Sequence, residues 1–508
     1  MTSETNNQTE SPTDPTQDPG YESQLLADRL AKLEQMRDEL GVNPYGQRVD
    51  GLEPIAEARA KYVEDAEGDD RAVVQIAGRV MLHRDNGKLQ WLQLRDMTGD
   101  IQIAASRKDV QTDTGFEIAR LADLGDLLVV EGPVMKTRTG EITVWASDVN
   151  IACKTLALPP EKFKGLQDAE LRYRRRYVDM YVNPEVCATL AARSRLISMM
   201  RSFMNERGFL EVETPILQTQ AGGAAARPFL THMNALDLDL SLRIAPELFL
   251  KRLLVGGMNR VYEIGRNFRN EGVDRSHNPE FTAIEVYEAF GNYLTMLELT
   301  ESMLRHLALA MAPDSGIIEF DGQPLNYAEP FRQVTYGDLF EEANGFAMTD
   351  FDRVRQRATE LGMTNAATLD DWLLVNQVWE ATVEEQLIQP TFVMDYPSAI
   401  SPLTRPKPDN PALCDRWELM VHGMELGTAY TELNDPAVQE AKFRQQLKGA
   451  DQEEQTYRTF DEDFLNALRV GMPPAGGLGL GVDRIIMLMT GSRTIRDVIP
   501  FPFMRPET

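Results

Sequence analysis

The pattern of apolar and polar residues changes several times along the 508-residue chain. Residues 1–20 are mostly Thr, Ser, Asn, Gln, Pro and acidic residues, and such a segment cannot bury enough apolar surface to offset its ordering entropy. Between Tyr21 and Leu40, apolar residues recur near helical spacing, and Gly41 stands where a helix commonly ends. We therefore expect a disordered acidic tail over 1–20, followed by an amphipathic helix.

Short strand-like runs replace the helical pattern between Ala72 and Cys153. Runs such as VVQIAGRVMLH, LQWLQLRD and EITVWASDVNIA are separated by turn pairs, including Asn86-Gly87 and Thr139-Gly140. Several short strands joined by glycine turns indicate a small barrel or sandwich. The proline-containing segment 156–170 follows, and it is expected to be a linker between domains.

From residue 171 to 508, helical patterns and strand-like runs are mixed, which is typical of an α+β domain. A long helix is expected from Val186 to Arg207, and residues 295–390 are expected to form a mainly helical insertion. A glycine-rich turn near the end leads into an apolar helix. The pattern as a whole predicts a small β domain followed by a larger α+β domain.

Charge qualifies this picture. The net charge of −27 by itself argues against a non-specific nucleic-acid binder, because phosphate backbones attract cationic surfaces. Basic residues nevertheless outnumber acidic ones seven to four over 71–110 and eight to three over 171–210. A solvated surface is the usual explanation of such stretches, and a local nucleic-acid site is the alternative.

Cysteine usage and hydropathy point to a reducing compartment. Cys153, Cys187 and Cys414 are scattered and form no CxxC pair, so neither a disulfide scaffold nor a structural zinc site is expected. The sequence has no basic and apolar leader and no uncharged apolar run of about 18 residues. We expect a cytoplasmic protein.

The densest chemistry lies in NRVYEIGRNFRNEGVDRSHNPEFTAIEVYEAF, residues 259–290. Arg269 and Glu271 lie two apart, so on a strand they share a face, and the same holds for Glu285 and Tyr287. A structural ladder of ion pairs is one explanation. The run contains more cations than a ladder needs, and a phosphate ligand is the other explanation, because arginine forks match phosphate oxygens.

Two further runs carry polar residues in apolar surroundings. In GGLGLGVDRIIMLMTG (476–491), glycines allow close helix–sheet packing, but Arg484 inside the apolar helix needs an anionic partner. In RWELMVHGMELGTAYTELND (416–435), Glu418, Glu425 and Glu432 recur every seven residues. They are either solvated acids on a helix or, on strands, carboxylates of a site, where they would coordinate Mg²⁺ together with phosphates.

These runs resemble the signature motifs of class II aminoacyl-tRNA synthetases. FMNERGFLEVETPIL (203–217) is similar to motif 1, GRNFRNEG with HNPEF to motif 2, and GLGLGVDR to motif 3. The segments 222–252 and 430–436 resemble the lysyl-tRNA synthetases in particular, and the resemblance extends over residues 21–506. It implies an antiparallel catalytic sheet flanked by helices over 171–508 and an anticodon-binding OB-fold barrel, with the N-terminal helix, over 21–155.

The resemblance also implies substrates and site residues. The substrates would be L-lysine, ATP and tRNA(Lys), with Mg²⁺ as the cofactor and a homodimer built through motif 1. Arg269 and Arg484 would be catalytic. ATP would contact Arg269, Glu271, His277, Asn278, Phe281 and Arg484. Lysine would contact Gly223, Glu247, Arg269, Glu285, Tyr287, Thr428, Tyr430 and Glu432. Mg²⁺ would bind Glu418 and Glu425, and the anticodon would meet Arg79, Trp91, Gln102 and Glu141.

Two positions depart from the family pattern. Thr428 stands where many lysyl enzymes have an asparagine, and Ser276 stands where some relatives have an arginine. Three alternatives remain open: an aspartyl or asparaginyl enzyme of the same subclass, a paralogue that attaches lysine to a translation factor, and a catalytically inactive binding protein. The acidic pocket argues against the first, the barrel against the second, and the retained Arg269, Glu271, Glu425 and Arg484 against the third.

Overall fold

The structure is a computed structural model that describes residues 19–157, 166, 168–224, 226–401, 404–449 and 460–506. The expected tail lies outside these residues except for its last two, and most of the expected linker lies outside them as well. The chain divides into two compact units, Met1–Cys187 and Ala188–Thr508. Within the described residues, no helix is long and apolar enough to cross a membrane.

The first unit contains a closed β-barrel. Its strands pair in the order β1-β2-β3-β5-β4-β6, and β1 also pairs with β4, so that β1, β2, β3, β5 and β4 form a ring. The strands are β1 (Val73–Asp85), β2 (Leu89–Arg95), β3 (Asp100–Ser106), β4 (Leu127–Lys136), β5 (Ile142–Trp145) and β6 (Asp148–Cys153). The strand-like runs left a barrel or a sandwich open, and the structure confirms the barrel that the family resemblance implied.

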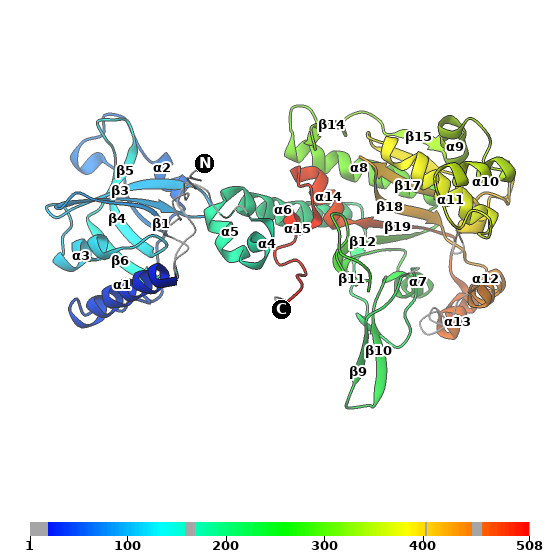
Figure 1. The fold of residues 1–508 in the computed structure, drawn as a ribbon, viewed down its shortest axis with the longest axis horizontal. Coiled ribbons are helices and arrows are strands. Elements are labelled where there is room, and N and C mark those ends of the chain that lie inside the picture. The colour runs from blue at the N-terminus through cyan, green and yellow to red at the C-terminus, as the bar shows by residue number, and fades with distance from the viewer. Residues whose placement is uncertain are drawn as a thin grey trace, which may run out of the picture. The chain divides into compact units, whose positions relative to one another are not determined.

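Helices accompany the barrel in the first unit (Figure 1). The expected N-terminal helix is α1. Its Leu33 and Met36 are buried, whereas Leu26 and Leu30 are exposed. Arg29 on α1 donates to the carbonyl oxygens of Leu124 and Thr155, at 2.9 and 2.8 Å, which ties the helix to the barrel loops. The helices are α1 (Pro19–Asp38), α2 (Ile55–Ala60), the 3-10 turn Gly68–Asp70, α3 (Asp113–Leu121), α4 (Ala169–Arg174) and α5 (Arg176–Val182), and α6 (Pro184–Glu206) runs into the second unit.

The second unit is built on an eight-stranded sheet with the order β15-β16-β17-β18-β19-β12-β11-β7. The pairs β15–β16 and β7–β11 are parallel, and the strands between them pair antiparallel. The strands are β7 (Leu210–Glu211), β11 (Arg260–Phe268), β12 (Glu280–Ala289), β15 (Arg332–Thr335), β16 (Thr391–Met394), β17 (Arg416–Val421), β18 (Met424–Thr431) and β19 (Ala475–Gly481).

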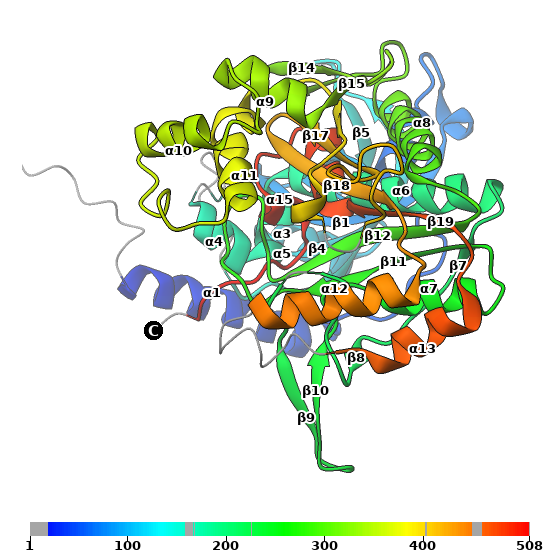
Figure 2. The same cartoon turned by 90° about the vertical axis from the view of Figure 1, so that its right-hand side faces the viewer.

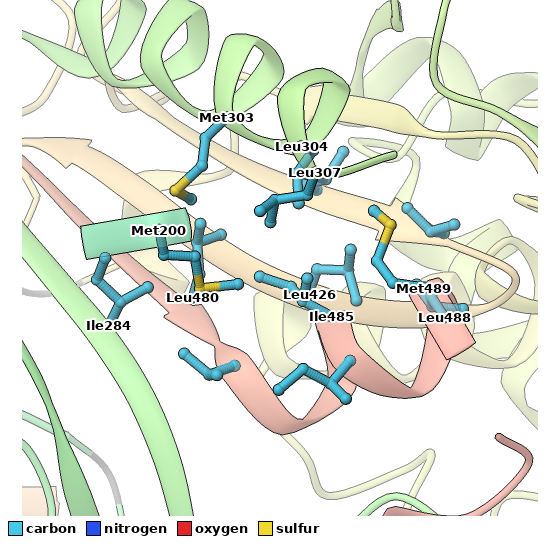
Figure 3. Close-up of a cluster of buried hydrophobic side chains, with 14 of the residues drawn as sticks. Met200, Ile284, Met303, Leu304, Leu307, Leu426, Leu480, Ile485, Leu488 and Met489 are labelled. Atoms are coloured by element: carbon cyan, nitrogen blue, oxygen red, sulfur yellow. The ribbon is translucent and has the colours of Figure 1, made fainter. Parts of the chain in front are cut away.

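One face of this sheet carries the main core of the unit. Helices α6, α8 (Tyr293–Met311) and α14 (Val482–Thr490) cover it, and their Met200, Leu304 and Ile485 pack with sheet residues such as Ile284 and Leu480 (Figure 3). Because successive strand residues point to opposite faces, the neighbours of these core residues lie on the other face of the sheet. That second face carries the candidate site.

Smaller elements surround the sheet. The hairpin β9–β10 projects from the unit in both ribbon views (Figures 1 and 2). The segment 295–390 contains helices α8 to α11 and also the short strands β13, β14 and β15, of which β15 belongs to the main sheet. The remaining elements are β8 (Leu217–Gln218), β9 (Leu230–Met233), β10 (Leu238–Leu242), α7 (Glu247–Val255), β13 (Ile317–Phe320), β14 (Gln323–Asn326), α9 (Tyr336–Asn344), α10 (Phe351–Glu360), α11 (Asp371–Thr382), α12 (Pro436–Gly449), α13 (Glu462–Gly471), α15 (Ile495–Val498) and the 3-10 turns Glu384–Gln386 and Ser398–Ile400.

Candidate functional site

The second face of the sheet gathers the polar residues that the sequence analysis singled out. On β12, Ile284 and Val286 lie in the core, so Glu285 and Tyr287 share the opposite face. On β17, Trp417 and Leu419 lie in the core, and Glu418 therefore shares the face of Glu285. The strand assignment thus resolves the open question about 416–435 in favour of strands.

Glycines of β19 leave the space in which these side chains lie. A Cβ atom added to Gly477 would come within 1.7 Å of Glu432 Oε1 and 2.8 Å of the Tyr287 ring. Gly479, two residues on, is different, because a Cβ atom there would meet only Glu285 Cγ at 3.8 Å. Close packing therefore requires a glycine at position 477 but not at 479. Gly477 forms the floor of the carboxylate pocket.

Three buried carboxylates define that pocket. Glu247, Glu285 and Glu432 are 6%, 8% and 1% exposed, and they come from the start of α7, from β12 and from the residue after β18. Tyr287 donates to Glu285 Oε2 at 3.2 Å. Gly223, in the left-handed region at φ +88°, lies against Glu247, since a Cβ atom there would come within 3.0 Å of Glu247 Cβ. Tyr430 lies on β18, two residues before Glu432.

Burial changes the acid–base behaviour of the pocket. Burial and the charge of Glu247 raise the pKa of Glu285 to about 8. Burial also raises the pKa of Glu432 to about 7, against the opposing effect of Lys251. A buried carboxyl group resists ionisation until a cation pairs with it, so this pocket is suited to an ammonium ligand.

Lys251 is a residue of this pocket that the sequence analysis missed. It is 1% exposed, and its Nζ lies 2.6 Å from Glu247 Oε1 and 2.5 Å from Glu432 Oε2. Burial alone would lower the pKa of Lys251, but the Glu247 and Glu432 carboxylates outweigh that effect and hold the pKa above its ordinary value. The available signal was its spacing of four residues from Glu247 on an apolar helix, which places both side chains on one face.

Arg269 links the carboxylate pocket to the motif 2 hairpin. It follows β11, its backbone N–H donates to the Pro279 carbonyl at 2.9 Å, and its guanidinium lies 5.1 Å from the centre of the Phe281 ring. The charge of Arg269 partly offsets the rise in pKa that burial and neighbouring carboxylates cause in both Glu285 and Glu425. Its Nε is buried and has no hydrogen-bond partner among the described residues. An anion beside it would satisfy that donor.

The other residues expected to bind ATP lie on the same hairpin. Asn278 is buried, and its Nδ2 donates to the Glu280 carbonyl at 2.6 Å. Its Oδ1 has no partner in the described part of the chain. Glu271 is exposed at the start of the loop, and Phe281 is half-buried on β12. The structure therefore brings Asn278 and Phe281 to the side of Arg269 and leaves Glu271 open to solvent.

His277 connects this loop to Arg484 on α14. The Arg484 Nη2 lies 3.0 Å from His277 Nε2, and His277 Nδ1 lies 2.7 Å from Asp274 Oδ2. Because arginine can only donate, Nε2 is the acceptor and Nδ1 carries the proton toward Asp274. Arg484 also donates to the Glu425 carbonyl oxygen at 2.5 Å. The motif 2 loop and the motif 3 helix are thus in direct contact through these side chains.

Glu418 and Glu425 were expected to hold Mg²⁺, and the two carboxylates lie close enough to act on each other electrostatically. Tyr396 donates to Glu418 Oε2 at 2.6 Å, and Arg416 pairs with Glu418 Oε1. The surrounding protein and the Glu418 carboxylate raise the pKa of Glu425, although the Glu425 side chain is open to solvent. A cation between two such carboxylates relieves their repulsion, and substrate phosphates would complete its coordination.

A further carboxylate, Glu384, lies within electrostatic reach of this pair. Burial and the charges of Glu380, Glu418 and Glu425 raise the pKa of Glu384 to about 7. Among the described residues, no group of three or more His, Cys, Asp or Glu is arranged to hold a metal ion. The two carboxylates would therefore depend on phosphate oxygens for a complete coordination shell.

Thr428 occupies the position where many lysyl enzymes have an asparagine. Its hydroxyl donates to the Trp417 carbonyl at 3.0 Å. Burial raises the pKa of Tyr430 to about 12, and the neighbouring Thr428 partly offsets that rise. Thr428 thus supports the neighbouring strand and Tyr430. Its hydroxyl proton is already used, so it does not reproduce the amide donor that an asparagine would provide.

The barrel of the first unit has a cavity of about 1000 Å³. Trp91, Gln102 and Glu141 line it, together with Trp145, whose ring centre lies 6.0 Å from that of Trp91. Arg59 pairs with Glu141 at 3.0 Å. Arg79 does not line this cavity: it donates to the Gly125 carbonyl at 2.6 Å and stacks over Tyr181. The structure brings three of the four expected anticodon residues together and leaves Arg79 apart.

Comparison with known proteins finds similar chains at high coverage. A family model described as tRNA synthetases class II (D, K and N) matches residues 168–505, and one described as OB-fold nucleic acid binding domain matches 74–152. The chain is 44% identical over 493 residues to the lysine–tRNA ligase of Carboxydothermus hydrogenoformans, covering 96% of this chain and 99% of that one. It is 46% identical over 495 residues to that of Pelotomaculum thermopropionicum, covering 96% of each. For that of Staphylococcus aureus, the values are 44% over 487 residues, 94% and 98%.

Proposed function

The chain belongs to the lysine–tRNA ligases of class II, and on this basis we propose the role of each site residue in the reaction. The enzyme joins L-lysine to the α-phosphate of ATP, releases pyrophosphate, and transfers lysine from the adenylate to the terminal ribose of tRNA(Lys). The observation that carries the choice of lysine is the pocket of three buried carboxylates, Glu247, Glu285 and Glu432.

Selectivity for lysine follows from the charge of this pocket. A buried carboxylate needs a paired cation, and lysine offers one ammonium group at each end of its carbon chain. Glu247 and the Gly223 backbone would hold the α-ammonium, and Glu285, Tyr287 and Glu432 would hold the ε-ammonium. Tyr430 would pack on the aliphatic chain. Aspartate and asparagine, the substrates of related class II enzymes, would leave these carboxylates unpaired or repelled.

Activation requires positioning and charge neutralisation. The substrate carboxylate is already a competent nucleophile, so no general base is needed: its oxygen forms a bond to the α-phosphorus while the bond to pyrophosphate breaks. The unpartnered Nε of Arg269 supports a bridging contact to the substrate carboxylate and the α-phosphate. Arg484 and His277 would meet the γ-phosphate, and Phe281 would stack on adenine with Glu271 and Asn278 nearby.

Magnesium is the proposed cofactor, held by Glu418 and Glu425. When bound, Mg²⁺ neutralises phosphate charge and orients the polyphosphate chain. Arg416 and Tyr396 keep the Glu418 carboxylate oriented toward this role. Their contacts fix the side chain before substrate arrives.

The barrel of the first unit is proposed to bind the anticodon of the tRNA. Trp91 would stack on an anticodon base, with Gln102 and Glu141 at base edges and Arg79 as a weaker contact. A homodimer through the motif 1 segment agrees with two exposed leucines of that segment, Leu210 on the edge strand β7 and Leu217 on β8, which are both 54% exposed. Sedimentation at equilibrium tests this assembly. The proposed location is the cytoplasm.

Exchange of labelled pyrophosphate into ATP tests the function directly. We expect exchange that depends on lysine and Mg²⁺ and that is absent with aspartate or asparagine. Exchange with either of those amino acids, but not with lysine, would reject the assignment.

The role of Arg269 is tested by the variant Arg269→Ala. Loss of one preorganised donor at developing charge costs about 10²-fold or more, so kcat for exchange should fall by at least that factor. Arg266→Ala is the matched control, because Arg266 lies on the same hairpin and pairs only loosely with Glu280, at 3.6 Å. Near-normal exchange by Arg269→Ala would remove Arg269 from the mechanism.

A further inference from the structure

The carboxylate pocket contains a cation of its own. Lys251 is buried between Glu247 and Glu432 and contacts one oxygen of each, Oε1 of Glu247 and Oε2 of Glu432. On the same helix, Arg252 turns to Asp461 instead, at 3.0 Å. The Lys251 ammonium is therefore committed to the pocket.

The oxygens that Lys251 does not contact lie toward residues of the lysine site. Glu247 Oε2 lies on the side of Gly223, 3.7 Å from the position of an added Cβ atom there. Glu432 Oε1 lies against Gly477. Neither Glu432 oxygen accepts a hydrogen bond from the described residues, so the contact of Oε2 with Lys251 is an ion pair. Lys251 thus contacts one oxygen of each carboxylate, and the other oxygen of each lies outside that contact.

The net charge of the pocket matches the charge of lysine. Once all three carboxylates are ionised, as ammonium binding requires, one internal ammonium leaves two uncompensated negative charges, which equals the number of ammonium groups on lysine. Arg243 is also within reach of Glu285, but it pairs with Glu263 at 2.5 Å. Arg269 faces Glu285 as well, and under the proposed function it takes up the substrate carboxylate.

We propose that Lys251 is a positioning and specificity-determining residue of the lysine pocket. Its ammonium is a built-in counter-ion that holds Glu247 and Glu432 in place for the two ends of the substrate and sets the pocket charge to match a dication. This inference rests on the proposed function and adds a residue to it. Lys251 does not touch the reacting atoms; it acts through the two carboxylates.

Removing the Lys251 charge should weaken lysine binding at neutral pH. Buried carboxylates that lose their cation take up protons rather than remain charged, and substrate then has to expel those protons. The groups that face this change are Glu247 on α7, Glu432 after β18, Glu285 and Tyr287 on β12, and Tyr430 on β18. Binding should recover as the pH is raised.

The test measures exchange kinetics of the full-length enzyme and of Lys251→Met. We expect KM for lysine to rise at least about tenfold at pH 7.5, with KM for ATP and kcat nearly unchanged, and the pH profile of KM for lysine to move at least about one unit higher. Lys154→Met is the matched control, because Lys154 is equally buried and pairs with Asp123 and Asp126 in the barrel unit. This control should keep the wild-type KM for lysine.

Chemical rescue separates charge from packing. Lys251→Ala removes the equivalent of propylammonium, so added propylammonium should lower KM for lysine toward the wild-type value, and 1-propanol should not. Thermal unfolding checks folding of each variant, and the smaller Lys251→Gln replaces Lys251→Met if that variant does not fold.

Each remaining outcome decides between the two proposals. Wild-type enzyme without lysine-dependent exchange rejects the proposed function itself. Wild-type exchange together with an unchanged or lower KM for lysine in the neutral variants, or with equal rescue by propanol, rejects the role of Lys251 alone.

Discussion

A carboxylate that binds an ammonium group must be ionised when the ligand is bound, and for Glu285 this condition has a cost at neutral pH. Burial and the neighbouring Glu247 raise the pKa of Glu285 to about 8 in the free protein. Below that pH the group is mostly protonated. Lysine binding should therefore release a proton from the pocket.

Lysine affinity should consequently depend on pH in a defined direction. As the pH rises from about 6 toward 8, less work is needed to ionise Glu285, so KM for lysine should fall by up to about tenfold per unit and level off above 8. Exchange kinetics across this range measure the effect. Glu285→Gln is the control, since it should bind lysine weakly with a flatter profile. A wild-type KM that is constant from pH 6 to 9 would contradict the assignment of Glu285.

At the scale of elements, strand parity and one glycine decide whether the pocket exists. Each strand of the sheet alternates between core and site, so Leu478 packs inward while Gly477 faces the carboxylates. Helix α7 uses a different periodicity for the same purpose. Its turn brings Glu247 and Lys251, four residues apart, to one side.

The variants Gly477→Ala and Gly479→Ala test this arrangement. The first would force a methyl group into Glu432 Oε1, so we expect a loss of about 1–3 kcal/mol in the free energy of unfolding and a higher KM for lysine. The second meets nothing closer than 3.8 Å and should unfold at nearly the wild-type temperature. Equal unfolding temperatures of the two variants would show that the pocket adapts to the extra carbon.

At the scale of the whole molecule, the net charge of −27 misleads about the partner. Some of the acidic residues lie in the carboxylate pocket and near Arg484, where they are proposed to bind a dicationic amino acid and Mg²⁺. The barrel carries Arg59, Arg84, Lys136 and Arg138 around its cavity. Local charge, not the total, is what a phosphate backbone meets within a screening length of about 8–10 Å.

Because the barrel is proposed to bind tRNA and the second unit to activate lysine, a substitution in the barrel should affect aminoacylation but not pyrophosphate exchange. Trp91→Ala should weaken aminoacylation by about fivefold to 150-fold in kcat/KM for tRNA, because stacking on one base contributes about 1–3 kcal/mol. Pyrophosphate exchange should remain normal. Tyr45→Ala, an exposed aromatic of the same unit outside the cavity, should change neither activity. Parallel loss of both activities in Trp91→Ala would indicate a folding defect instead.

The sequence predicted which face a residue takes within a continuous motif. It did not predict contacts between residues from distant parts of the chain. Parity placed Glu285 and Tyr287 on one face, and the structure agrees. The position of Arg79 away from the barrel cavity was not predictable, because its contacts are with Gly125 and Tyr181. Lys251 escaped notice because a lysine on a helix is ordinarily solvated, and only burial makes it part of a site.

Turn residues and hydrophobic periodicity act over a few residues, so the sequence predicted the short strands of the first unit and the positions of the three motifs. The choice of a barrel over a sandwich came from the family resemblance. Tertiary structure alone decided that Glu247, Lys251 and Glu432 meet, and that a carboxylate such as Glu285 resists ionisation. The reason is that ion pairing and desolvation depend on what surrounds a group in space. These surroundings are assembled from α7, β12, β18 and β19, and the first and last of these elements begin almost 230 residues apart in the sequence.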